Sequence, residues 1–138
     1  MAKEIECAVI GSGQPFASLP GELSIADEFY DYDAKYVNGT SKTIIPANLD
    51  FELLDDIRMV AIKVYTALGV AGMARIDFFL EHGTNRILLN ELNTIPGFTD
   101  ISMYPKMLDA SGMDFSMQLD RLIELAFEHR EQRSALKR

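Results

Sequence analysis

The sequence is poor in cysteine, in basic residues and in long apolar runs. Cys7 is the single cysteine among 138 residues, which excludes an intrachain disulfide and argues against a cysteine-based zinc site. With 13 Lys and Arg against 21 Asp and Glu, the formal charge is -8. Unassisted binding to nucleic acid or to an anionic membrane is therefore not expected, because clustered cations hold phosphate.

No apolar stretch approaches the roughly 18 residues of a membrane span, and the start MAKEIECAVIGSG is too short in apolar residues for a signal peptide. We therefore expect a cytoplasmic protein. Its 48% hydrophobic and 25% charged residues suit one ordinary domain with a core, here residues 1–138. If such an acidic chain handles phosphate, a divalent cation is expected to mediate the contact.

Hydrophobic periodicity predicts strands interleaved with helices. Strands are expected over residues 3–10, 21–26, 42–47, 73–81 and 86–93, and helices over residues 51–68, 104–111 and 115–130. Asp50 is a candidate N-cap for the first helix, Gly69 and Gly112 are expected to end the first and second, and residues 131–138 are expected to fray. Cys7 falls in an alternating apolar strand and is expected to be a core residue. This order predicts an α+β fold, an antiparallel sheet with helices packed on one face.

Residues 27–42, DEFYDYDAKYVNGTSK, show neither helical nor strand periodicity. They form a loop long enough to suspect function, and we expect it to be mobile without substrate.

The hairpin MARIDFFLE–HGTN–RILLNELN is the most informative stretch. If its turn is the three-residue loop Gly83-Thr84-Asn85, Asp77 faces Glu91 and Arg75 faces Asn93 on one side of the sheet. Two carboxylates opposed in this way need a cation or a proton between them. Oxygen ligands suit Mg²⁺, and Arg75 is placed to hold a phosphate or a developing oxyanion. This pattern predicts a metal-nucleotide centre.

Two alternatives stay open for this hairpin. The polar residues can lie on a solvated face, with Arg75 screening the acids. A two-residue Gly83-Thr84 turn would instead shift the register by one and set Asp77 across from Asn90.

Four blocks in this order, EIECAVIG, FYDYDAKY, ARIDFFLE and NELNTIPGFT, closely resemble the C-terminal part of the D-alanine–D-alanine ligases of the ATP-grasp superfamily. The resemblance runs from about Glu4 almost to the end of the last helix and implies an ATP-grasp C-terminal domain. These ligases are about twice as long or more, so the chain is expected to be a fragment, with Met1-Ala2 as an expression start.

The resemblance implies a ligase that joins two D-alanines through an acyl phosphate, for peptidoglycan synthesis, with ATP and two Mg²⁺, or Mn²⁺ as a substitute, and a homodimeric parent. Glu4 would hold the nucleotide ribose, Lys35 would meet the γ-phosphate, and Arg75 would stabilise the tetrahedral oxyanion. The implied metal ligands are Asp77, Glu91 and Asn93. The fragment alone is expected to be inactive.

The resemblance also implies contacts with the amino acid substrates. Tyr36 would help close a loop over the substrate, Gly97 would offer a backbone N–H to the intermediate, and Ser102 would bind the second substrate's carboxylate, with Met103 alongside. Residues 100–101, Asp-Ile, depart from the family pattern before Ser102.

Structural roles stand beside these assignments. Lys35 and Tyr36 can be solvent-exposed loop residues, and Glu4 an exposed strand residue. Ser102 can be a helix N-cap, and Gly97 can serve a type II turn after Pro96. The alternative functions are another ATP-grasp carboxylate-amine or D-lactate ligase, and a non-catalytic module that presents an acidic hairpin to a partner or to Ca²⁺.

Overall fold

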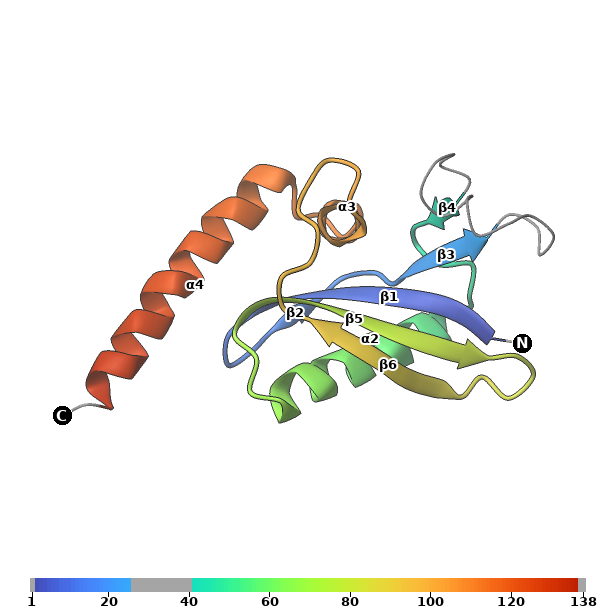
Figure 1. Ribbon diagram of the computed structural model, residues 1–138, viewed down its shortest axis with the longest axis horizontal. Coiled ribbons are helices and arrows are strands. Elements are labelled where there is room, and N and C mark those ends of the chain that lie inside the picture. The colour runs from blue at the N-terminus through green and yellow to red at the C-terminus, as the bar shows by residue number, and fades with distance from the viewer. Residues whose placement is uncertain (1, 26–40, 137–138) are drawn as a thin grey trace.

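A computed structural model describes residues 2–25 and 41–136, and these fold into one antiparallel sheet with helices packed against it (Figure 1). The strands are β1 (Ala2–Gly11), β2 (Phe16–Ala17), β3 (Gly21–Ile25), β4 (Ser41–Ile44), β5 (Gly72–Glu81) and β6 (Ile87–Asn93). The helices are α2 (Phe51–Ala67), α3 (Met103–Ala110) and α4 (Phe115–Ala135). The sheet order is β4-β3-β1-β5-β6, with β2 paired to β1. The predicted α+β class and antiparallel sheet are confirmed.

The central strand β1 is buried on both faces. Residues 5–11 are all buried, and alternate side chains join different core clusters. Ile5, Cys7 and Val9 pack with α2, whereas Ala8 and Ile10 pack with α3 and α4. Among the described residues, the helices are thus divided between the two faces of the sheet, with α2 on one and α3 and α4 on the other, rather than gathered on one face as expected (Figure 1). The reason is that β1 has no solvated face over this length.

Two buried tyrosines fix the end of β1 from opposite faces. The Tyr65 hydroxyl of α2 donates to the Gly11 carbonyl at 2.8 Å, and the Tyr104 hydroxyl of α3 donates to the Val9 carbonyl at 3.1 Å. Each tyrosine is 1% exposed, so both hydroxyls satisfy backbone acceptors that water cannot reach.

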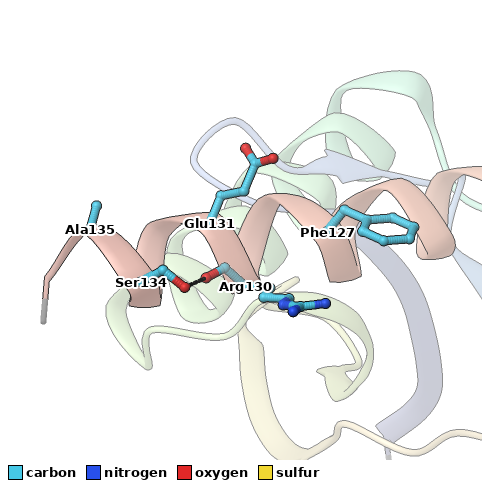
Figure 2. Close-up of a pocket in the computed structure, with 5 residues that line it drawn as sticks. All are labelled: Phe127, Arg130, Glu131, Ser134 and Ala135. Carbon is cyan, nitrogen blue, oxygen red and sulfur yellow. Dashed lines mark hydrogen bonds between the residues drawn. The ribbon is translucent and has the colours of Figure 1, made fainter.

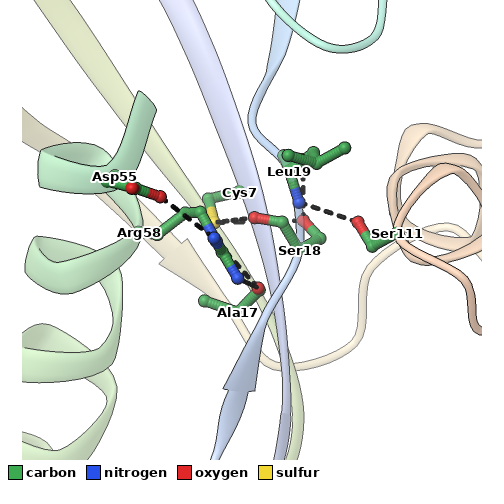
Figure 3. A network of polar contacts seen from close by, with 7 residues as sticks. All are labelled: Cys7, Ala17, Ser18, Leu19, Asp55, Arg58 and Ser111. Atoms are coloured by element: carbon green, nitrogen blue, oxygen red, sulfur yellow. Dashed lines mark hydrogen bonds and ion pairs between the residues drawn. The ribbon is translucent and has the colours of Figure 1, made fainter. Parts of the chain in front are cut away.

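The stretch from the end of β2 to Leu19 is tied to both helical layers by hydrogen bonds. Arg58 of α2 donates from Nε and Nη2 to the Ala17 carbonyl, at 3.2 Å in each case. The Leu19 N–H donates to Ser111 Oγ, after the end of α3, at 2.8 Å. Figure 3 shows these contacts on the two sides of the segment. They hold the crossing from β1 to β3 in a single position.

Cys7 is fully buried, as predicted. Its Sγ lies 3.5 Å from the Ser18 carbonyl, to which it donates (Figure 3). Burial raises the pKa of the Cys7 thiol to about 12. The thiol is therefore neutral and serves packing rather than nucleophilic chemistry.

The helix boundaries follow the predicted signals at most ends. Asp50 caps α2 by accepting from the Leu53 N–H at 2.9 Å, and Gly69, with φ +64°, follows its C-cap. Gly112 follows α3 with φ +91°. The last helix does not stop at Arg130, because α4 continues to Ala135 through residues that were expected to fray. Among the described residues, no helix combines the length and apolar character needed to cross a bilayer.

Candidate functional site

The β5–β6 hairpin has a longer turn than the sequence predicted. The Glu81 N–H donates to the Arg86 carbonyl at 3.0 Å, so the loop is the four residues 82–85 rather than the three residues 83–85. Beyond the turn, Phe78 pairs with Leu89. This pairing is offset by one residue from the predicted register.

A β-bulge then restores the predicted register at the site. The ladder shifts between Asp77 and Phe78, which leaves Asn90 as the extra residue of β6. Asp77 consequently pairs with Glu91 and Arg75 with Asn93, as predicted. Without the bulge, Asp77 would face Asn90, the arrangement of the two-residue-turn alternative.

Arg75 and Asp77 form a bidentate ion pair on the α3 face of the sheet. Arg75 Nε donates to Asp77 Oδ1 at 2.8 Å, and Nη2 donates to Oδ2 at 2.7 Å. Asp77 is 3% exposed, so it does not lie on a solvated face. The hydrogen bonds to Asp77 are the main reason that the pKa of Arg75 is raised. Glu91 completes the arrangement, with Oε1 lying 3.8 Å from Arg75 Nη2.

Glu6 is a member of this cluster that the sequence reasoning missed. It pairs with Asp77 in the β1–β5 ladder, and its Oε2 lies 3.5 Å from Arg75 Nε. Glu6 is 3% exposed, and within ranges 2–25 and 41–136 no group donates a hydrogen bond to its Oε2. Burial, opposed by Arg75 and reinforced by the nearby acids Asp77, Glu4 and Glu91, raises the pKa of Glu6 to about 7. The sequence held one sign of this, because period-two alternation places Glu6 on the same face of the strand as Glu4, a predicted site residue.

The charge of this cluster favours a cation. In the part of the chain that the structure describes, three carboxyl groups, those of Glu6, Asp77 and Glu91, surround the guanidinium of Arg75, and one buried oxygen, Glu6 Oε2, has no hydrogen-bond partner. Within the described ranges 2–25 and 41–136, no three Asp, Glu, His or Cys side chains enclose a metal ion by themselves. The donors that face each other across β5 and β6 are oxygens. They fit Mg²⁺, which takes few protein ligands and completes its shell with phosphate and water.

Glu4 lies on the same face, two residues before Glu6 in β1. It is half-buried and pairs with Leu23 of β3 and Phe79 of β5. The structure thus brings Glu4 to the side of the sheet that carries the acidic cluster, and its ribose contact stays a prediction.

The strand β6 leads into a segment that is organised by side-chain contacts with its own backbone. Asn93 Oδ1 accepts the Ile95 N–H at 2.9 Å. Ser102 Oγ contacts Thr99 twice, at 3.2 Å from its N–H and 2.8 Å from its Oγ1. Ser102 occupies the N-cap position of α3, yet its side chain makes no capping hydrogen bond. The Ser102 hydroxyl therefore does not cap α3.

Gly97 is required by close approach rather than by turn geometry. Its φ is not positive, so the type II turn alternative is not formed. A Cβ at this position would lie 2.9 Å from Ser102 Oγ. Met103, by contrast, is 8% exposed and belongs to the core cluster of α3, so its predicted substrate contact would come from its backbone.

Lys35 and Tyr36 fall outside the residues that the structure describes, together with residues 27–40 of the predicted loop; Ser41 and Lys42 belong to β4. The hollow drawn in Figure 2, about 490 Å³ in volume, is lined by residues of α4 and shares none with the acidic cluster. We therefore place the candidate site at the cluster around Arg75.

Known proteins resemble this chain over most of its length. The family model described as D-ala D-ala ligase C-terminus matches residues 1–124. A D-alanine–D-alanine ligase of Chlorobaculum parvum is 54% identical over 128 residues, covering 93% of this chain and 35% of the relative. One from Clostridium acetobutylicum is 56% identical over 125 residues, covering 91% of this chain and 36% of the relative.

Solved structures that resemble this chain are also D-alanine–D-alanine ligases. The D-alanine–D-alanine ligase of Coxiella burnetii superposes with a TM-score of 0.81 at 42% identity, covering 99% of this chain and 35% of that one. The Bacillus anthracis ligase complexed with ATP gives a TM-score of 0.76 at 29% identity, over 96% of this chain and 42% of that one.

The fold and these matches define a domain of the ATP-grasp class of ligases. Within that class, the chain belongs to the D-alanine–D-alanine ligase C-terminal family. It spans about a third of the length of the curated relatives that it matches.

Proposed function

We propose that this chain is the part of an ATP-dependent D-alanine–D-alanine ligase that carries the metal ligands and the oxyanion arginine. The observation that supports this most is the bidentate Arg75–Asp77 pair lying across the ladder from Glu91, in a chain whose family is defined by such ligases. The product, D-alanyl-D-alanine, would serve peptidoglycan synthesis and thereby cell shape.

In this proposal the carboxylate of the first D-alanine receives the γ-phosphoryl group of ATP, and the amine of the second D-alanine then displaces phosphate from the acyl phosphate. Arg75 stabilises the charge that develops on the reacting oxygens, with its planar fork already oriented by Asp77. Asp77, Glu91 and Asn93 would hold two Mg²⁺, or Mn²⁺ in their place. The ions would neutralise phosphate charge during transfer.

The remaining residues bind and orient. Glu4 would accept hydrogen bonds from the ribose, and Lys35 would contact the γ-phosphate. Tyr36 would cover the substrate. The Gly97 N–H would meet the tetrahedral centre at a position where the missing Cβ permits close approach, and Ser102 would donate to the second substrate's carboxylate.

The whole ligase is inferred to be cytoplasmic, because ATP and the free amino acids are cytoplasmic substrates. Its family resemblance further implies a homodimer. Residues 1–138 would be its C-terminal ATP-grasp domain, and by itself it would bind ATP weakly and ligate nothing.

The test is an assay of a full-length ligase that carries this domain. ATP-dependent formation of D-alanyl-D-alanine is expected, and Arg75→Ala should lower kcat by about 100-fold or more. A screen of D-lactate and D-serine as acceptors tests the alternative ligases, since the solved neighbour VanG of Enterococcus faecalis is a D-Ala:D-Ser ligase and residues 100–101 depart from the family pattern. Full ligation by the Asp77→Asn and Glu91→Gln variants would overturn the assignment of these ligands and favour a non-catalytic acidic module.

A further inference from the structure

We propose that Glu6 is a positioning residue that holds the Arg75 guanidinium in place when Asp77 engages a divalent cation. This inference rests on the proposed function, because it takes Asp77 to be a metal ligand. It assigns a role to a side chain that the proposed mechanism does not use.

Among the described residues, Arg75 has one strong partner, Asp77, which is also a proposed metal ligand. Both terminal oxygens of Asp77 accept from Arg75, at 2.8 and 2.7 Å. A cation bound to the same carboxylate would withdraw its negative charge and would also repel the guanidinium. Arg75 therefore needs another anion if it is to stay on the α3 face once the metal is bound.

Glu6 meets the requirements for that second anion. Its Oε2 is buried, accepts no hydrogen bond from any residue that the structure describes, and lies 3.5 Å from Arg75 Nε. A movement of the guanidinium by roughly half an ångström would bring this pair to an ordinary hydrogen-bond length of about 2.9 Å. Such a shift would also satisfy an acceptor that is otherwise unpaired, which offsets part of the loss of the Asp77 contact.

The surroundings of Glu6 make it a fixed support. It lies in the central strand β1, paired with Asp77 on one side and Gly21 on the other. Glu91 is a poorer candidate, because its side chain is 58% exposed and it is itself a proposed metal ligand. Glu22 offers a matched control, since it is also a buried glutamate near β1 but pairs with Lys3 at 3.0 Å on the opposite, α2 face of the sheet.

The first experiment needs no metal and follows the Arg75 Nε–H resonance of the 138-residue chain by NMR. In Asp77→Asn, Glu6 should take over the guanidinium, so the Nε–H signal stays protected from solvent exchange. In Asp77→Asn/Glu6→Gln, exchange should be at least about tenfold faster, whereas Asp77→Asn/Glu22→Gln should match the single variant. Equal exchange in all three folded variants would overturn the proposal.

The second experiment measures Mn²⁺ binding to the chain by calorimetry at about pH 8, above the pKa of Glu6, and uses single substitutions only. Glu6→Gln should weaken binding by about tenfold, because Arg75 then competes with the ion for Asp77, while Glu22→Gln should leave the affinity unchanged. An unchanged affinity in Glu6→Gln, together with loss of binding in Asp77→Asn and Glu91→Gln, would overturn the role of Glu6 alone. Absence of Mn²⁺ binding by the unaltered chain, or binding that survives both ligand substitutions, would overturn the proposed metal site and this inference with it.

Discussion

Asp77 and Glu91 face each other across the β5–β6 ladder, and Arg75 Nη2 reaches both carboxylates, at 2.7 and 3.8 Å. Like charges directly opposed in a sheet are unfavourable, so the guanidinium stabilises the pair as well as the site. The contact with Asp77 is the shorter and more buried of the two, which makes it the larger contribution to stability.

Replacing Asp77 by Ala should therefore destabilise the chain. The partly buried Arg75 would keep only the longer contacts to Glu6 and Glu91, and the free energy of unfolding should fall by about 2 kcal/mol, less than for a fully buried pair. Urea denaturation measures this change. Asp55→Ala is the control, because its pair with Arg58 is exposed and should be worth no more than about 0.5 kcal/mol. Equal losses in the two variants would contradict the prediction.

The stability of the chain should depend on pH through Glu6. Burial raises its pKa from 4.5 to about 7 in the folded chain, so the folded state binds this proton more tightly than the unfolded state does. Below about pH 4.5 the group is protonated in both states, and as pH rises towards about 7 the folded state loses up to roughly 3 kcal/mol relative to the unfolded state.

Glu6→Gln removes this titration while keeping the shape of the side chain. The variant should gain stability relative to the unaltered chain between about pH 4.5 and 7, and the gain should then level off. Urea unfolding of both proteins across this range measures the difference, in which other titrating groups largely cancel. A difference that does not change with pH would refute the shift.

Cys7 should resist alkylation in the folded chain. The thiol is 0% exposed and burial raises its pKa to about 12, so iodoacetamide at about pH 8 can react only after the core opens. The reaction should be at least about 100-fold slower than in the chain unfolded by urea, and mass spectrometry measures both rates. Similar rates in the two states would mean that β1 is not buried on the α2 face.

Gly97→Ala should act through Ser102. Because the added Cβ would lie 2.9 Å from Ser102 Oγ, the hydroxyl has to rotate and lose its contacts with Thr99, at a cost of about 1 kcal/mol. In a Ser102→Ala background the same substitution should cost much less. A double-mutant cycle measured by urea unfolding tests this coupling, and additive effects would exclude it.

Much of the site could be predicted from the sequence because its residues are local. Arg75, Asp77, Glu91 and Asn93 lie in one hairpin, where period-two alternation and pairing fix the shared face. Glu6 was missed because its place depends on β1 pairing with β5, about 70 residues away, and no local pattern encodes that pairing.

The fold was predicted less completely for the same reason. Alternation located β1. Whether the face that carries Glu4 and Glu6 would be exposed to water depended on the packing of α3, a helix that is distant in the sequence. The hairpin turn was predicted one residue too short, and the register at the site was nevertheless right because the bulge at Asn90 compensates. A three-residue turn without a bulge and a longer turn with a bulge give the same register at the site, and period-two alternation cannot distinguish them.

The bulge at Asn90 lies between the tip of the hairpin and the acidic cluster around Arg75. Residues 82–85 are largely exposed, and the register next to them is already offset from the register at Asp77 and Glu91. The tip can therefore accept a fluorophore, an epitope or a short insertion without displacing the acids, and the exposed His82 is a convenient place to attach a label.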